Sequence, residues 1–224
     1  MTQDNINLLT LRQYYLVMSS HTQKPFLDSG NGCYMFEVKS DADIFVKRVA
    51  YVFLAEPKYY VQKNFCTEFY SYGIETIHAK TRKNDDYIDI PVEKEDAKKQ
   101  YYNPAASRAV YQLKQTRQTK YLRMMKDLSF FVPVLIDLRL PKQYPVMHYS
   151  YATFNGADKN YLLFTTIQEF DDWNKEQGEK WKPMEVNLTT FGRIRVGNFV
   201  MINPMSDKLL LTDKQIRIST GEKG

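Results

Sequence analysis

The sequence predicts an α+β (mixed α/β) protein of two related halves, each a small mixed β-sheet covered by helices. Three observations predict this fold class. Short apolar runs without breakers, such as residues 161–164, are typical of buried strands. Apolar side chains at helical spacing follow that run, as Phe170 and Trp173 do. The order of strand, polar cap and helix occurs twice. Phe36 and Phe45 are separated by the same number of residues as Phe164 and Trp173.

The first half begins with a helical pattern at residues 5–19, which Asp4 can cap. Residues 33–38 predict a strand, and Ser40 is placed to cap the helix that follows. The inner face of that helix consists of Ala42, Phe45, Val49 and Val52.

An insertion occupies residues 57–97. Residues 58–72 predict a helix ended by a glycine. Residues 75–79 and 87–90 alternate apolar and polar side chains across a polar turn, which predicts a hairpin.

Residues 105–128 form the longest helical pattern, with an apolar stripe that Arg117 interrupts. We therefore expect an amino-terminal half at residues 1–127, which contains the insertion and a basic helix at residues 105–127. The second half is expected at residues 128–224.

The second half opens with a strand at residues 130–136. Pro133 at its centre favours an edge strand or a bulge, because proline cannot donate to a ladder. Residues 144–154 alternate apolar and polar side chains and should pair with residues 161–164. Thr166 starts a capping-box pattern and therefore a helix.

A further apolar strand, residues 199–202, ends at Asn203 and Pro204, and the leucines of residues 209–211 follow a polar turn. Residues 130–216 resemble the amino-terminal domain of the SseB family, the enhanced serine sensitivity proteins. The positions that carry the resemblance are Phe164, Thr165, Trp173, Asn203, Pro204 and residues 209–211.

This resemblance implies a bacterial, cytoplasmic α/β domain without a defined molecular activity, so it carries over no catalytic residue. Residues 20–105 look like a diverged second copy. In that alignment Pro25 corresponds to Pro145, and Asn103–Pro104 corresponds to Asn203–Pro204.

Composition and targeting patterns favour a cytoplasmic protein. The 224 residues are 43% hydrophobic and 25% charged, which is ordinary for a globular protein. Cys33 and Cys66 lie far apart at no metal-ligand spacing, so we expect reduced core thiols. We find no signal-peptide pattern, and no apolar run approaches the ~20 residues of a membrane span.

The sequence offers no residue set for catalysis, cofactor binding or metal binding. His21, His78 and His148 do not pair at ligand spacing, and the chain lacks nucleophile-elbow and phosphate-loop motifs. Asp171 and Asp172 are adjacent on a helix and therefore do not converge on one point. We expect no cofactor and favour a protein that is not an enzyme.

The sharpest feature is a basic segment at residues 97–126, which contains eight Lys and Arg residues and no acidic residue, while the whole chain has a net charge of +5. One interpretation is a patch for an acidic protein or nucleic acid. The simpler one is a solvated helix, because nucleic-acid binders usually carry a larger excess of positive charge. The candidate patch residues are Arg108, Lys114, Arg117, Lys120, Arg123 and Lys126.

These observations favour a non-enzymatic, SseB-like protein that binds another protein, in a regulatory role. One alternative is an enzyme or small-ligand protein with a pocket between the halves, lined by residues 144–154 with His148. The other is nucleic-acid binding through residues 97–126. The sequence makes no prediction of oligomeric state.

Overall fold

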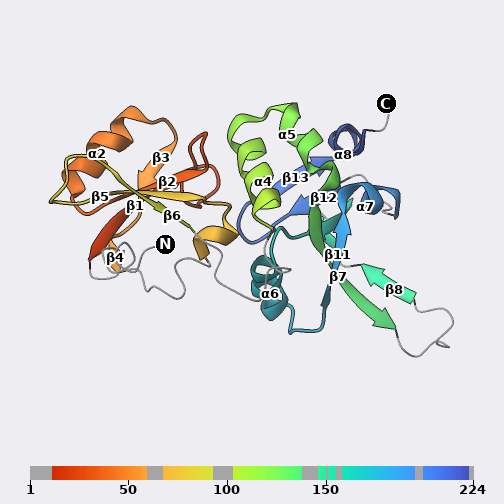
Figure 1. Cartoon of the computed structure of the whole chain (residues 1–224). Helices are drawn as coiled ribbons and strands as arrows, with labels where there is room; N and C mark the ends of the chain where they lie inside the picture. Colours follow the sequence, from red (N-terminus) through yellow and green to blue (C-terminus); the bar gives the residue numbers. More distant parts are fainter. Residues whose placement is uncertain are drawn as a thin grey trace. The chain divides into compact units, whose positions relative to one another are not determined.

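The fold is described from a computed structural model, for residues 12–59, 68–92, 103–137, 146–149, 151–154, 158–194 and 199–221. The chain divides into two compact units, residues 1–100 and 101–224 (Figure 1). Both are mixed α+β, as predicted. The division falls earlier than the expected boundary at residue 127, because the basic helical segment shares a core with the strands that follow it. Within the described residues, no helix combines the length and apolar character needed to cross a bilayer.

The first unit is one sheet with strand order β3-β1-β2-β5-β6, and β4 also pairs with β1. Only the β2–β5 pairing within it is parallel. Helix α2 follows β2. The elements are β1 (Gln13–Ser19), β2 (Gly32–Phe36), α2 (Lys39–Arg48), β3 (Val52–Leu54), β4 (Lys58–Tyr59), β5 (Thr76–Lys80) and β6 (Ile88–Pro91).

Two of the helices predicted in this unit are wrong at residues 13–19 and 58–59, which form strands. Residues 13–19 of the expected first helix form strand β1, whose side chains point alternately to the two faces of the sheet. Residues 58–59 of the second form strand β4, although residues 68–71 are helical. The remaining parts, residues 5–11 and 60–67, lie outside the described residues.

The hairpin agrees with prediction, and helix α2 does so except at its end, where Val49 is the extended C-cap and Val52 lies in strand β3. Strands β5 and β6 are antiparallel across a turn of residues 81–87. Helix α2 buries Ala42 against the sheet and packs Phe45 beside it. Ser40 does not cap it, however, because the helix starts at Lys39. The cap position is therefore Val38, two residues before Ser40, and no side chain caps the helix.

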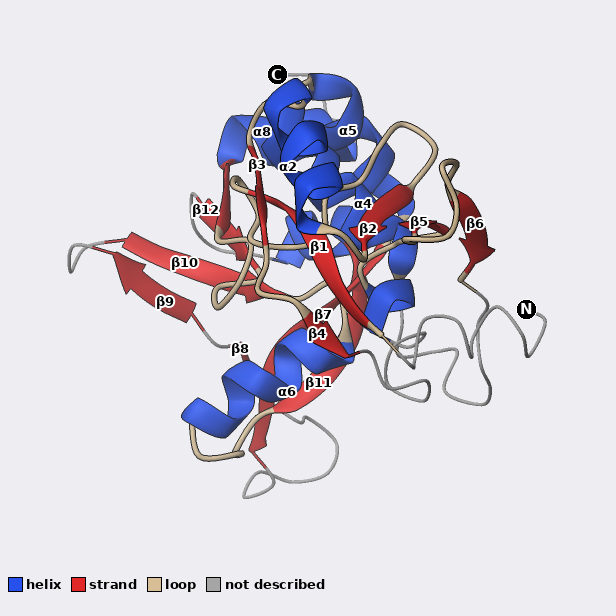
Figure 2. Cartoon of the chain, turned by 90° about the vertical axis from the view of Figure 1, so that its left-hand side faces the viewer, coloured by secondary structure: helices blue, strands red, loops and turns tan. Residues whose placement is uncertain are grey.

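The second unit contains two sheets, with strand orders β13-β12-β10-β9 and β11-β7-β8. Reciprocal 2.8 Å backbone hydrogen bonds between Phe131 and Phe164 join them. Helix α6 runs beside β7 and β11 (Figure 2). The elements are α4 (Pro104–Thr116), α5 (Thr119–Met124), the 3-10 turn η2 (Met125–Asp127), β7 (Ser129–Asp137), β8 (Val146–Tyr149), β9 (Tyr151–Phe154), β10 (Asp158–Leu163), α6 (Ile167–Glu176), β11 (Lys182–Asn187), α7 (Leu188–Ile194), β12 (Phe199–Ile202), β13 (Leu209–Thr212) and α8 (Asp213–Thr220).

Strand β7 is the central strand of its sheet, which corrects the expectation of an edge or bulge at Pro133. Two features let this proline sit there. It lies opposite Pro183, which also lacks an N–H, and β8 pairs only from Val134 onward. The alternating run 144–154 is likewise divided between strands: β9 pairs with β10 as expected, whereas β8 pairs with β7.

The two units share a strand order. In the first unit, β1 pairs antiparallel with β2, β2 pairs parallel with β5, and β5 pairs antiparallel with β6. In the second unit, β9 pairs antiparallel with β10, β10 pairs parallel with β12, and β12 pairs antiparallel with β13. An internal duplication would produce this arrangement. The expected match of Asn103–Pro104 to Asn203–Pro204 is wrong, because Asn103 caps α4 in the second unit. The counterpart of the Asn203 turn is the β5–β6 turn at residues 81–87.

The residues that resemble the SseB pattern meet where β10 and β12 end. Asn203 is buried with a φ of 50°, and its amide oxygen accepts the Thr165 N–H at 2.9 Å. Its amide nitrogen donates to Thr165 Oγ1 at 2.9 Å and to Asp207 Oδ2 at 2.6 Å. The Trp173 ring lies 5.4 Å from that of Phe164. One side chain thus ties the parallel pair to the turn after it.

We expect Asn203→Ala to lower the free energy of unfolding of the second unit by roughly 3 kcal/mol, since it leaves buried polar partners unsatisfied and forces alanine into a left-handed conformation. Asn203→Gly should cost about 1 kcal/mol less, because only the backbone strain is relieved. Urea unfolding followed by tryptophan fluorescence measures this, as both tryptophans, Trp173 and Trp181, lie in the second unit. Equal effects of alanine and glycine would contradict the role given to backbone conformation.

In the first unit, Glu37 follows β2 and holds the β5–β6 turn. Its Oε2 lies 2.7 Å from the Arg12 guanidinium and accepts the Arg82 N–H at 3.0 Å. Burial by itself would raise the pKa of Glu37, but these hydrogen bonds and the charges of Arg12 and Arg82 outweigh it and lower the pKa. Glu37 therefore adds stability above its unfolded-state pKa, and that stability disappears as pH falls through the lowered value.

Glu37→Gln should accordingly destabilise the first unit by about 1 kcal/mol at pH 7 and have little effect once Glu37 is protonated, near pH 2. Urea unfolding followed by circular dichroism at both pH values measures the difference. Glu56→Gln, an exposed carboxylate in the same unit, is the control and should change neither value. A Glu37→Gln effect of the same size at both pH values would contradict the ionic origin.

Candidate partner-binding face

The predicted basic residues lie on α4, on its C-cap, on α5 and on η2, and not on one helix. Helix α4 ends where Arg117 takes a left-handed conformation, with φ of 56°, and donates its N–H to the Leu113 carbonyl. Helix α5 and η2 follow. The expected single helix at residues 105–128 is therefore corrected to a helix, a break and a second helix.

Buried side chains fix which residues of these elements face outward. Helix α4 buries Ala106, Ala109, Val110 and Leu113 in the core of the second unit. Leu122 of α5 and Met125 of η2 enter the same core. Lys120, Arg123 and Lys126 alternate with these anchors and are exposed.

Two of the six predicted residues do not belong to this exposed set. Lys114 is half-buried, and its ammonium donates to the Asp207 carbonyl, which ties α4 to the β12–β13 turn. Arg108 is half-buried and has partners of its own. Lys114 therefore has a structural role, and Arg117, Lys120, Arg123 and Lys126 remain as candidates.

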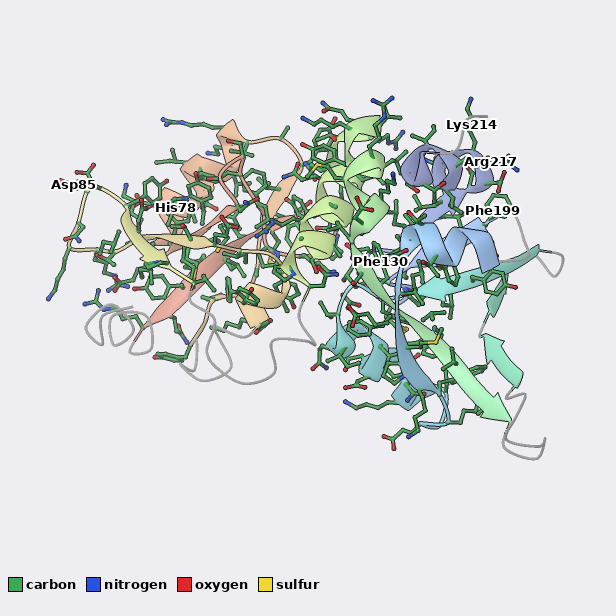
Figure 3. All side chains as sticks on the ribbon, turned by 45° about the vertical axis from the view of Figure 1, so that its right-hand side comes forward. His78, Asp85, Phe130, Phe199, Lys214 and Arg217 are labelled. Carbon is green, nitrogen blue, oxygen red and sulfur yellow. The ribbon has the colours of Figure 1, made fainter. Side chains whose placement is uncertain are left out.

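Helix α8 contributes two further cations, Lys214 and Arg217, which sequence reasoning missed. They lie on the outer side of the helix (Figure 3), while Ile216 enters the core. A capping box between Thr212 and Gln215 fixes where α8 begins, and the helix packs beside α5. The sequence Lys214-Gln-Ile-Arg217 does indicate two exposed cations around a buried isoleucine. It does not indicate that α8 packs against α5.

We define the basic face as Arg117, Lys120, Arg123, Lys126, Lys214 and Arg217. Arg217 pairs with Asp213 at 2.7 Å, and no ion pair with another described residue involves the other five cations. Met124 is exposed by 58% among them. The Lys126 ammonium lies near Gly221 at the carboxyl end of α8, where the helix dipole favours a cation. The face is thus cationic, exposed and contains one apolar side chain.

The ring of Tyr121 belongs to the wall beneath the face. It is half-buried against the core, and the Lys120 ammonium lies 4.8 Å above its centroid. This cation–π contact holds Lys120 in place and covers one side of the ring.

Other residues considered from the sequence lie elsewhere. His78 sits between two carboxylates, with Nδ1 2.7 Å from Asp89 Oδ1 and Nε2 3.4 Å from Asp28 Oδ2 (Figure 3). The His21 ring lies 4.7 Å from the Tyr51 ring, between centroids, in a tilted arrangement. Among the described side chains, no group of three or more His, Cys, Asp or Glu could hold a metal ion.

The remaining expectations fall partly outside the described residues. Cys33 is a buried free thiol, and burial, reinforced by the Asp28 carboxylate, raises its pKa well above the usual value. Cys66 lies outside the described residues, as do the side chains of residues 144–154 with His148, so the expected pocket there stays a prediction. Asp172 contacts Gln168 and Lys175, whereas Asp171 faces a cleft.

No protein-family model matches the sequence, and no curated protein matches it. Among solved structures, the chain is similar to Tic22 from Plasmodium falciparum at 17% sequence identity. That match covers 83% of this chain and 84% of that chain, with a TM-score of 0.21.

Proposed function

We propose that this chain is a non-catalytic, SseB-like binding protein of the bacterial cytoplasm, and that its basic face binds an acidic surface of a partner protein. The observation that carries the proposal is the face itself. Six exposed cations lie on α5, α8 and the segments that flank α5, and Met124 of α5 is exposed as well. Within the described residues only Arg217 of these cations has a carboxylate partner. Such cations attract and orient an anionic partner.

The exposed thioether favours a protein over a nucleic acid. Methionine is common at protein-binding surfaces because it adapts to different apolar partners, and an apolar centre within a polar rim is the usual composition of a protein interface. Proteins that bind single-stranded nucleic acids typically combine a positively charged groove with aromatic rings on which bases stack. Tyr121 does not offer one, since Lys120 covers its ring and the core packs around it.

The SseB-like pattern implies no defined activity and names no partner. Its residues form the Asn203 cluster, whose hydrogen bonds are internal to the fold. The pattern thus accounts for stability, and we assign the binding role to the basic face instead.

The test compares charge-reversed variants in pull-downs from nuclease-treated lysate of the source organism. Lys120→Glu with Arg123→Glu should abolish retention of a specific protein at about 50 mM salt, and Met124→Ser should weaken it. Lys47→Glu with Arg48→Glu is the matched control, because both residues are exposed on α2 and the charge change is identical. The control should retain the partner, and raising the salt to about 300 mM should release it.

The proposal is wrong if both double variants lose the partner equally, because net charge and not the face would then be responsible. It is also wrong if purified chain binds a 20-nucleotide DNA or RNA through Lys120 and Arg123 while no protein is lost from the variant. That second outcome would assign the face to nucleic acid.

A further inference from the structure

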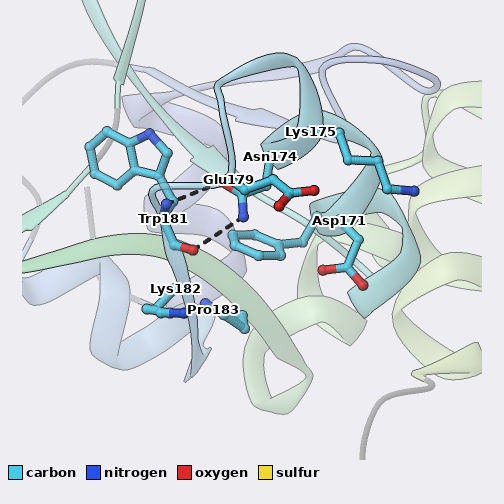
Figure 4. A pocket seen from close by; sticks show the side chains of 8 residues that line it. Asp171, Asn174, Lys175, Glu179, Trp181, Lys182 and Pro183 are labelled. Carbon is cyan, nitrogen blue, oxygen red and sulfur yellow. Dashed lines mark hydrogen bonds between the residues drawn. The ribbon is translucent and has the colours of Figure 1, made fainter.

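An open cleft of about 380 Å³ lies between α6 and β11 in the second unit (Figure 4). Asp171 and Lys175 project from α6 on one side, and Lys182 and Pro183 lie on β11 at the other. The segment that connects the two elements closes the cleft. Its lining residues are Phe170, Asp171, Asn174, Lys175, Glu179, Trp181, Lys182 and Pro183. The cleft shares no residue with the basic face.

The walls are held by internal hydrogen bonds, so the shape of the cleft does not depend on a ligand. The buried Asn174 amide donates to the Trp181 carbonyl at 3.2 Å and accepts the Trp181 N–H at 3.1 Å. Glu179 has a φ of 58° and donates its N–H to the Asn174 carbonyl at 2.8 Å. Gly178, with a φ of 77°, makes this tight reversal sterically accessible. The turn therefore fixes Glu179 at the cleft.

The cleft is lined by two carboxylates and two lysines, but these four charges do not form ion pairs with one another. Lys175 lies 3.6 Å from Asp172, outside the lining. Asp171, Glu179 and Lys182 make no ion pair with another described residue. Partial desolvation raises the pKa of Asp171; Lys175 opposes this rise, while Asp172 and Glu179 add to it. The attraction of a cation beside Asp171 would offset both the cost of desolvation and the repulsion from Asp172 and Glu179.

We propose that this cleft binds a small zwitterion of the amino-acid class. The ligand ammonium lies between Asp171 and Glu179, and the ligand carboxylate faces Lys182. Pro183 supplies the apolar contact for its side chain, and the buried Phe170 lies at the floor of the cleft. A metal ion fits less well, because the lining contains only two carboxylates and no histidine, and ion binding would leave Lys182 facing a second cation.

The test titrates the proteinogenic amino acids, except tryptophan and tyrosine, into the full chain up to about 10 mM. The readout is tryptophan fluorescence, since Trp181 lines the cleft, with calorimetry to confirm each response. For any amino acid that binds, the analogue lacking the carboxylate and the N-acetylated analogue are compared. Both should bind at least tenfold more weakly. Equal binding of either analogue, or no response to any amino acid by both methods, overturns the proposal.

Asp171→Asn and Lys182→Gln should each weaken binding at least tenfold, whereas Asp172→Asn, the adjacent carboxylate outside the lining, should not. Because the folded state raises the pKa of Asp171, ionisation of this group opposes folding as pH rises through that value. Asp171→Asn should therefore melt at the same temperature as the wild type or higher at pH 7, which separates lost binding from lost folding. Unchanged binding in Asp171→Asn would also overturn the assignment.

Discussion

The second unit depends on one parallel strand pair, β10 and β12, and on the side chain that closes it. A parallel pair cannot be joined by a tight turn, so its connection must leave the sheet and return. Here that connection contains α6, β11 and α7, and thereby supplies one strand of the second sheet, the cleft walls and a helix of the core. Asn203 then fixes both strand ends in a buried position where water is excluded.

The first unit solves the same problem with different chemistry. Its parallel pair is β2 and β5, and Glu37 bridges the ends through Arg12 and the Arg82 backbone. The bridge at Glu37 is ionic and partly exposed, so it depends on pH and salt. The Asn203 side chain carries no charge of its own and makes its hydrogen bonds in a buried position.

The sequence was sufficient for elements with an unambiguous local signal. The Thr166 cap, the β5–β6 hairpin and the apolar strands β10 and β12 all follow from residue type and spacing. It was insufficient at residues 14–18, where nearly every side chain is apolar and neither period stands out. The break at Arg117 was also hidden, because neither glycine nor proline marks it. The two candidate sites depend on tertiary neighbours: α8 beside α5 for the basic face, and the turn at Gly178 and Glu179 for the cleft.

The burial of Cys33 gives the first unit a built-in chemical reporter. Its thiol is inaccessible in the folded sheet and strongly disfavours ionisation, so an alkylating reagent can reach a reactive thiolate only after β2 separates from its neighbours. The rate at which this one cysteine is modified, followed by peptide mapping, therefore counts openings of the first unit. Both tryptophans lie in the second unit. Cysteine modification therefore reports the opening of the first unit and tryptophan fluorescence that of the second, so the two rates can be measured separately in the intact protein.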